Sequence, residues 1–242
     1  MKPTKARTYW DEASWPLQAA AILVVLDIAG LAVSRYLVSG GAGPMKSIVG
    51  DWAIVTRILL ALTFAAYFYG RGVPARAFGL TMAGFRRRMR EFWTCLAVVV
   101  PLAIALSLMA ILILRAGGAR DQIAPPLKFE DSERRVAWIW VFVVALPPME
   151  ELLYRGILHP ALRGRLGVGW AVAAGGLIFG LIHWFYGIDI ASLPAYAAGG
   201  AALAWVYERT GSLFFPWLLH VATNLAAVWV SSYPGLFEAL RK

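Results

Sequence analysis

The chain has 242 residues, of which 60% are apolar, and a formal net charge of +9 at pH 7. A soluble domain of this length cannot bury so much apolar surface, so the composition predicts an all-α, polytopic helical membrane protein. The basic residues cluster in short segments between apolar runs, which is typical of membrane topology signals and argues against nucleic-acid binding. The single cysteine, Cys95, offers no disulfide and excludes a cysteine-based zinc site.

Three apolar runs in the first half of the chain are long enough to predict transmembrane helices, about residues 17–38, 48–70 and 92–114. Four charged residues lie in the first two runs: Asp27, Arg35, Asp51 and Arg57. We expect Asp27, and Asp51 with Arg57, to lie near the membrane interface or to pair with each other. The loop at 71–91 carries six arginines and one glutamate, which predicts a cytoplasmic position.

Four further apolar runs bring the expected number of transmembrane helices to about seven: residues 136–158, 170–186, 193–207 and 213–231. Pro147 and Pro148 are expected to interrupt the fourth span. A short basic turn at 159–169 follows it, and His159 is expected to be a surface residue at the membrane edge.

The positions of the basic loops predict the topology. The loops at 71–91 and 159–169 fall on the same side if the N-terminus is cytoplasmic, and the mixed-charge loop at 115–135 then lies outside. We expect a bacterial inner membrane protein with one integral membrane domain over 1–242. Within it, residues 1–135 form the N-terminal spans and residues 136–231 form a catalytic core.

The fourth predicted span contains two adjacent carboxylates at a depth where charge is costly, which makes them functional candidates. Glu151 and Arg155 are four residues apart, so they share a helix face and can form an ion pair. Glu150 points about 100° away and has no partner at helical spacing. A structural ion pair therefore explains Glu151 and Arg155 as well as a functional one does, but it does not explain Glu150.

Two later spans each carry a histidine. His183 follows Phe179 by four residues on a glycine-containing span, and His220 precedes Asn224 by four on another. Either motif alone is explained by hydrogen bonds that hold membrane helices together. Buried polar groups in lipid need partners, so we expect these residues to meet Glu150 in a polar site between helices 4, 5 and 7.

A carboxylate beside a histidine can activate water, and a histidine with an asparagine can stabilise an oxyanion, so the residues favour hydrolysis. The chain lacks the GxSxG and HExxH motifs of serine hydrolases and zincins. Two alternatives use the same polar groups: a membrane transporter, and a non-catalytic membrane scaffold or immunity protein. No inverted repeat supports transport.

The motifs EExxxR, FxxxH and HxxxN, in this order, resemble the CPBP family of intramembrane endopeptidases. These are CAAX proteases and bacteriocin-processing (Abi) proteins, also called type II CAAX prenyl endopeptidase-like. All three motifs match without substitution, including the flanking PPMEELLYRGIL and FGLIHW, and the resemblance covers about residues 136–230.

The resemblance implies a peptidase site of six residues. Glu150, assisted by His183, would activate water, His220 and Asn224 would form the oxyanion site, and Glu151 with Arg155 would support them. A site without a cofactor is favoured, although Glu150, His183 and His220 are also the residues that could hold a divalent metal such as zinc. The expected substrate is a membrane-anchored protein or peptide, in C-terminal sorting and processing or in bacteriocin maturation or immunity. The oligomeric state is not predicted.

Overall fold

The computed structural model describes residues 15–39, 44–120, 123, 135–185, 188, 190 and 192–242. The predicted outer loop at 115–135 lies mostly outside these residues. The side chain of Asp51 also lies outside the described set, so its predicted pairing stays a prediction.

The described residues are helical and contain no strand, so the predicted all-α class is confirmed. The helices before the central region are α2 (Trp15–Ser39), α3 (Pro44–Gly70), the short 3-10 helix η1 (Ala75–Phe78) and α4 (Phe85–Ala116). The central run consists of α5 (Arg135–Trp140), η3 (Val141–Ala145), α6 (Leu146–Glu151), η4 (Leu152–Leu158) and α7 (His159–Phe185). The last helices are α8 (Leu193–Thr210), α9 (Phe214–Ser231) and α10 (Pro234–Arg241).

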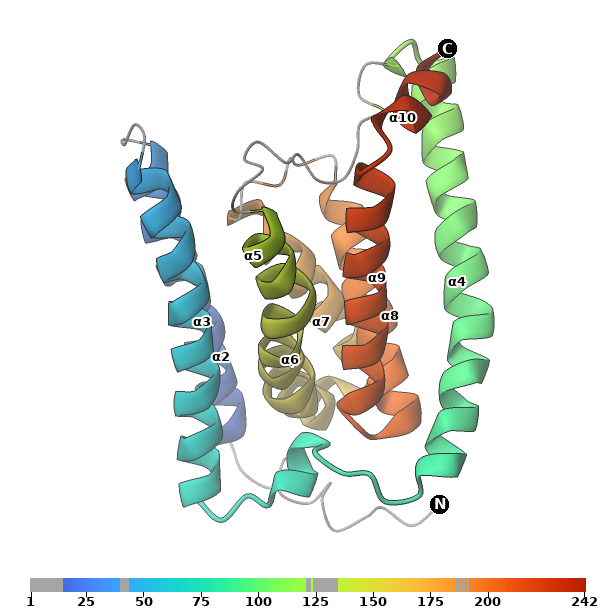
Figure 1. Ribbon diagram of the computed structural model, residues 1–242. Coiled ribbons are helices and arrows are strands. Elements are labelled where there is room, and N and C mark those ends of the chain that lie inside the picture. Colours follow the sequence, from blue (N-terminus) through green and yellow to red (C-terminus); the bar gives the residue numbers. More distant parts are fainter. Residues whose placement is uncertain are drawn as a thin grey trace.

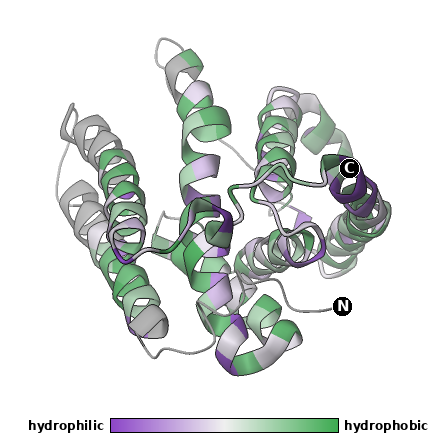
Figure 2. Cartoon of the chain, turned by 90° about the horizontal axis from the view of Figure 1, so that it is seen from below, coloured by the Kyte–Doolittle hydropathy of each residue, from purple (hydrophilic) through white to green (hydrophobic). Residues whose placement is uncertain are grey.

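Each of the seven predicted spans coincides with a helical segment. Three stretches in the described part of the chain are long and apolar enough to cross a membrane: Phe85–Ala116, Val141–Phe185 and Phe214–Ser231. Two shorter apolar helices occupy residues 18–30 and 55–70. Seen along the helices, the ribbons are coloured mainly as hydrophobic residues (Figure 2). The molecule is an integral membrane protein.

The predicted break between the fourth and fifth spans is wrong. The helix does not end at Leu158 but continues into α7, and the expected basic turn is reduced to a kink at Gly167. This glycine has φ 74° and ψ 174°, a backbone conformation that side chains with a Cβ rarely adopt. The kink therefore separates two spans without a loop.

The predicted interruption at Pro147 and Pro148 is also wrong, because the chain stays helical through both prolines. Proline removes an N–H donor, so carbonyl groups four or five residues earlier lose a partner. The helix adapts with a π-helical segment before the prolines, Val141–Ala145, and a second one after the glutamates, Leu152–Leu158. Such π-helical segments are frequent at functional sites.

Two apolar clusters lie on opposite sides of the central run (Figure 1). The first packs α2 and α3 against η4 and α7, with Leu23, Phe68 and Ile157 at its centre. The second joins α4, α8 and α9 through Phe92 and Phe215, among others. The rest of α4 exposes a long row of apolar side chains, as expected for a helix that faces lipid.

Helices α7 and α8 approach closely, as the glycine-containing span predicts. A Cβ on Gly176 would lie 2.6 Å from the Ala197 carbonyl oxygen, and one on Gly200 would lie 2.8 Å from the Phe179 Cβ. Small residues are what permit this contact between membrane helices. The close approach brings Phe179 to the centre of the helix bundle.

The predicted basic segments meet at one end of the molecule. They meet through the end of α8, where Arg163 pairs with Glu208 at 2.6 Å and the adjacent Arg209 pairs with Glu91 at 2.7 Å. This agrees with the prediction that these segments share one side of the membrane.

The prediction that His159 is a surface residue is wrong. It is 1% exposed, and its Nε2 lies 3.0 Å from Glu208 Oε1. His159 is the first residue of α7 and lies against the end of α8, which explains the difference, because the neighbouring helix covers it.

Candidate active site

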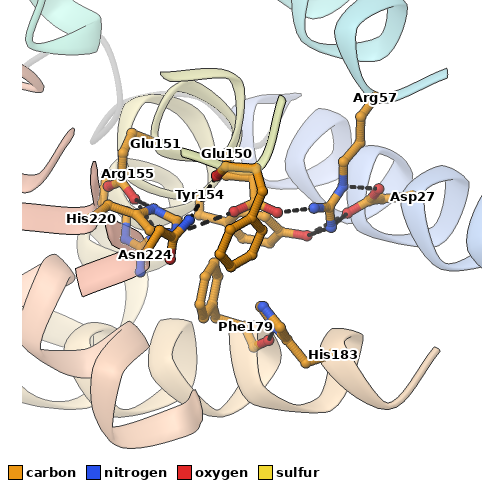
Figure 3. A network of polar contacts seen from close by, with 11 residues as sticks. Asp27, Arg57, Glu150, Glu151, Tyr154, Arg155, Phe179, His183, His220 and Asn224 are labelled. Carbon is orange, nitrogen blue, oxygen red and sulfur yellow. Dashed lines mark hydrogen bonds and ion pairs between the residues drawn. The ribbon is translucent and has the colours of Figure 1, made fainter. Parts of the chain in front are cut away.

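Both glutamates of the first motif are buried at the end of α6. Glu150 is 3% exposed and Glu151 is 1% exposed. They lie between the two π-helical segments, and their carboxylates point to different neighbours, as their adjacent positions on a helix require (Figure 3). Each carboxylate can therefore be followed to its own partners.

Glu151 makes the pair that its spacing predicts. Arg155 Nη1 donates to Glu151 Oε1 at 2.9 Å, and both side chains are buried. Arg155 also donates to the Gly200 carbonyl oxygen of α8 at 3.0 Å, and its guanidinium carbon lies 4.6 Å from the centre of the Phe179 ring. The predicted ion pair is thus confirmed, and it is joined to two further helices.

His220 of α9 lies between the two glutamates. Its Nδ1 is 2.8 Å from Glu151 Oε1, and its Nε2 is 3.5 Å from Glu150 Oε2. The structure therefore brings the first and third motifs together, as predicted. A carboxylate accepts hydrogen bonds, so the short contact assigns the proton of a neutral His220 to Nδ1 and leaves Nε2 as an acceptor facing Glu150.

Glu150 has a partner that the sequence did not predict. Arg57 of α3 donates through Nη1 to Glu150 Oε1, across 93 positions of the chain. Arg57 is therefore a partner of Glu150 in addition to the histidines that we expected to meet it. The signal in the sequence was a charged residue inside a predicted span, but helical spacing cannot connect residues on separate helices.

Asp27 of α2 holds Arg57 from the other side. Arg57 Nε donates to Asp27 Oδ1 at 3.0 Å, and Nη2 donates to Oδ2 at 2.9 Å. The predicted pairing is confirmed for Asp27 and Arg57. Both residues are buried inside the bundle, Asp27 at 3% and Arg57 at 2% exposed, which agrees with the predicted pairing.

His183 takes a different position from His220. Its Nδ1 lies 2.6 Å from the Phe179 carbonyl oxygen of its own helix, and its ring stacks on Tyr196 with centroids 4.3 Å apart. Figure 3 shows it at the edge of the polar network. The ring of Phe179 lies against both histidines, 4.6 Å from His183 and 5.9 Å from His220 between centroids. The phenylalanine of the second motif thus separates the two imidazoles.

Asn224 has a contact that explains its place on α9. Its Nδ2 donates to the Phe142 carbonyl oxygen at 2.9 Å. Phe142 lies five residues before Pro147, where the missing N–H leaves a carbonyl short of a donor. One N–H of the carboxamide is therefore engaged with the backbone, and its second N–H is the one with which an oxyanion could be bound.

The arrangement does not fit the ligand set for a metal that the sequence left open. Within the described ranges, no group of three His, Cys, Asp or Glu side chains is placed to hold a metal ion. The guanidinium of Arg57 contacts Glu150 directly, and its positive charge opposes a cation at the same carboxylate. Independence of a metal stays a prediction.

Comparison with known proteins gives a family for the segment that holds the motifs. Residues 132–226 match the family described as Type II CAAX prenyl endopeptidase Rce1-like. The chain is also similar to the protein named "Putative membrane peptidase YdiL" of Bacillus subtilis (strain 168), with 30% identity over 88 residues, or 36% of this chain. That alignment covers 34% of the relative, so the chain spans about a third of the length of the curated protein that it matches. No solved structure matches the chain.

The matched residues contain Glu150, His183 and His220, and with them all three motifs. The resemblance drawn from the motifs is confirmed over residues 132–226, which match the Rce1-like, type II CAAX prenyl endopeptidase family.

Proposed function

We propose that this protein is an intramembrane endopeptidase that hydrolyses a peptide bond in a membrane-anchored protein or peptide. One observation carries the proposal: His220 lies between two buried carboxylates, in a segment that matches a peptidase family. A carboxylate and an imidazole nitrogen that face each other can hold and deprotonate a water molecule.

In the proposed mechanism, the water is activated between Glu150 Oε2 and His220 Nε2. At 3.5 Å these atoms are too far apart for a strong direct hydrogen bond and too close for a water in line between them, so the water lies beside the pair and donates one O–H to each. The pair takes a proton from the water, whose oxygen attacks the peptide carbonyl carbon. The same proton then goes to the leaving amine, so the site returns to its starting state.

The charges around the water support this step. Three buried carboxylates and two guanidiniums surround the site, with a formal sum of −1. The proton taken from water stays within the site and the oxyanion carries the matching negative charge, so the step adds no net charge at membrane depth, where charge is costly. Glu151 and Arg155 hold His220 in the tautomer that leaves Nε2 free to accept the proton.

The other motif residues receive supporting roles in the proposal. The second N–H of Asn224 donates to the oxyanion, in keeping with the role that the resemblance implies. The proposal transfers the assisting role from His183 to His220, because His220 is the histidine that faces Glu150 at 3.5 Å. His183 and Phe179 form the neighbouring wall of the site.

The proposed substrate is the membrane anchor of an exported protein or a membrane-associated peptide, and the proposed location is a bacterial inner membrane. A C-terminal tail helix fits a site placed among transmembrane helices, since the scissile bond can enter from the bilayer. Sorting or processing of C-terminal anchors is the preferred process, with bacteriocin maturation or immunity as the alternative.

Co-expression with reporters tests the proposal. Each reporter carries a C-terminal membrane anchor from a gene near that of this protein, and cleavage is followed by size. Glu150→Gln and His220→Gln are expected to abolish cleavage while the protein still accumulates in the membrane. His159→Gln is the matched control, because His159 forms a buried pair with a glutamate at the end of the bundle, away from the site. Cleavage that persists in Glu150→Gln sinks the proposal.

A non-catalytic scaffold or immunity protein is the second candidate. The observation that favours it is that Glu150 and Glu151 each have an arginine partner, as in a network that only joins helices. That function predicts that Glu150→Gln lowers the unfolding temperature of the purified protein. The endopeptidase instead predicts loss of cleavage at an unchanged unfolding temperature.

A further inference from the structure

The N-terminal helices contribute a buried ion pair that reaches the candidate site. Asp27 of α2 and Arg57 of α3 are both at least nine-tenths buried, and the guanidinium extends to Glu150 of α6 (Figure 3). Residues 27 and 57 lie outside the segment 132–226 that matches the peptidase family. Neither residue belongs to one of the three motifs.

Arg57 is held in one orientation by groups on both sides. Asp27 binds it through two parallel hydrogen bonds of 3.0 and 2.9 Å, the geometry in which an arginine is most firmly fixed. Tyr154 completes the arrangement: its hydroxyl donates to Asp27 Oδ2 and accepts from Arg57 Nη2 at 3.3 Å. Tyr154 lies one turn after Glu150, so the clamp is also tied to the helix that it serves.

The clamp divides the two oxygens of Glu150 between different partners. Oε1 accepts from Arg57, while Oε2 faces His220 Nε2 at 3.5 Å. We propose that Arg57, fixed by Asp27 and Tyr154, is a positioning residue that sets the carboxylate of Glu150 for its task, so that the α2–α3 pair is part of the active site. This inference rests on the endopeptidase function proposed above.

A purely structural pair does not require this geometry. Asp27 alone satisfies Arg57 as a counter-ion, since a bidentate carboxylate balances one guanidinium. The additional bond to Glu150 fixes a carboxylate that has no partner within its own helix. Positioning within a fraction of an ångström is what a general base needs.

Cleavage kinetics test the inference with an uncharged replacement of the pair. The double variant Asp27→Asn, Arg57→Gln keeps hydrogen-bonding groups at both positions, so that neither side chain is left as an unpaired buried charge. We expect kcat for the cleaved reporter peptide to fall about 100-fold with little change in KM, because the carboxylate is misplaced while substrate contacts remain. Arg57→Lys alone restores a cation without the planar fork, and is expected to recover about tenfold of that loss.

The matched control is a second arginine–carboxylate pair between two helices. Arg209 of α8 and Glu91 of α4 lie 2.7 Å apart, with 49% and 30% of their side chains exposed. The variant Arg209→Gln is expected to leave kcat unchanged. The unfolding temperature and the elution profile in detergent confirm that each variant is folded.

Chemical labelling gives a readout that needs no substrate. Dicyclohexylcarbodiimide modifies carboxyl groups in apolar surroundings, and the guanidinium of Arg57 covers one oxygen of Glu150. The fraction of Glu150 labelled, measured by mass spectrometry of the peptide that contains it, should rise in the double variant and stay constant in Arg209→Gln.

The outcomes separate this inference from the proposed function. If Glu150→Gln abolishes cleavage but the folded double variant keeps kcat within about threefold of the parent, Arg57 is not a positioning residue and the function stands. Unchanged labelling of Glu150 overturns the inference as well. If the parent cleaves no reporter, the proposed function fails, while a rise in labelling still supports the link between Arg57 and Glu150.

Discussion

The two sides of His220 are built from the same chemistry in different ways. On one side, Glu151 pairs with Arg155, four residues further along the same helical run. On the other, Glu150 pairs with Arg57, which comes from a separate helix 93 positions earlier. The adjacent residues Glu150 and Glu151 thus form similar buried ion pairs. One partner lies on the same helical run and the other on a separate helix.

The two carboxylates connect different sets of helices. The Glu151 side reaches α8 through the bond from Arg155 to the Gly200 carbonyl oxygen, and α9 through His220. The Glu150 side reaches α2 and α3 through the Asp27–Arg57 pair. The two glutamates therefore join the two halves of the bundle at the histidine between them.

The largest effect is expected from a substitution of Glu150. Glu150→Gln is isosteric, and it removes the charge that takes a proton from water. We expect initial cleavage rates to fall about 10³- to 10⁴-fold, the upper range for a general base. Rates are compared at equal amounts of folded protein, and a loss of less than tenfold contradicts the role of Glu150.

The next largest effect is expected from breaking the pair of Glu151 and Arg155. Arg155→Met leaves Glu151 buried without its cation, and loss of one partner of a buried pair costs about 3–5 kcal/mol. We expect a lower unfolding temperature and less folded protein in detergent. The double variant Glu151→Gln, Arg155→Met removes both charges and should recover much of the stability. Equal loss in both variants shows that packing of Arg155, not its charge, is what matters.

A smaller effect is expected from a substitution of Asn224, which lies on the same helix as His220. Asn224→Leu leaves the Phe142 carbonyl without its side-chain donor, at a cost of about 1–3 kcal/mol in the free energy of unfolding. If the amide also binds the oxyanion, kcat falls about 10²- to 10³-fold in the protein that is folded. The neighbouring variant Thr223→Val serves as control, and normal kcat in folded Asn224→Leu leaves only the structural role.

No effect is expected from removing metal ions. The guanidinium of Arg57 at Glu150 disfavours a cation there, so cleavage after treatment with a chelator should match the untreated protein. The assay compares initial rates before and after dialysis against the chelator. Activity that is lost and then restored by zinc contradicts this prediction and the arrangement proposed for the water.

Much of the fold could be predicted because lipid imposes it. Apolar runs of sufficient length must be helices, since backbone groups in a bilayer need internal partners, and each predicted span coincides with a helical segment. The errors are at Pro147, Gly167 and His159. In each case a neighbouring segment or an altered helix supplies what the local sequence lacks, which a reading of one segment at a time cannot show.

The helical membrane architecture, the three motifs and the pair of Glu151 with Arg155 could all be predicted from the sequence. These follow from apolar length and from the spacing of residues on one helix, both of which are local properties. Two contacts are seen in the folded molecule alone. His220 lies between the glutamates, and Arg57, held by Asp27, pairs with Glu150. Contacts between separate helices depend on how the helices pack. A buried charge pairs with whichever opposite charge this packing brings next to it.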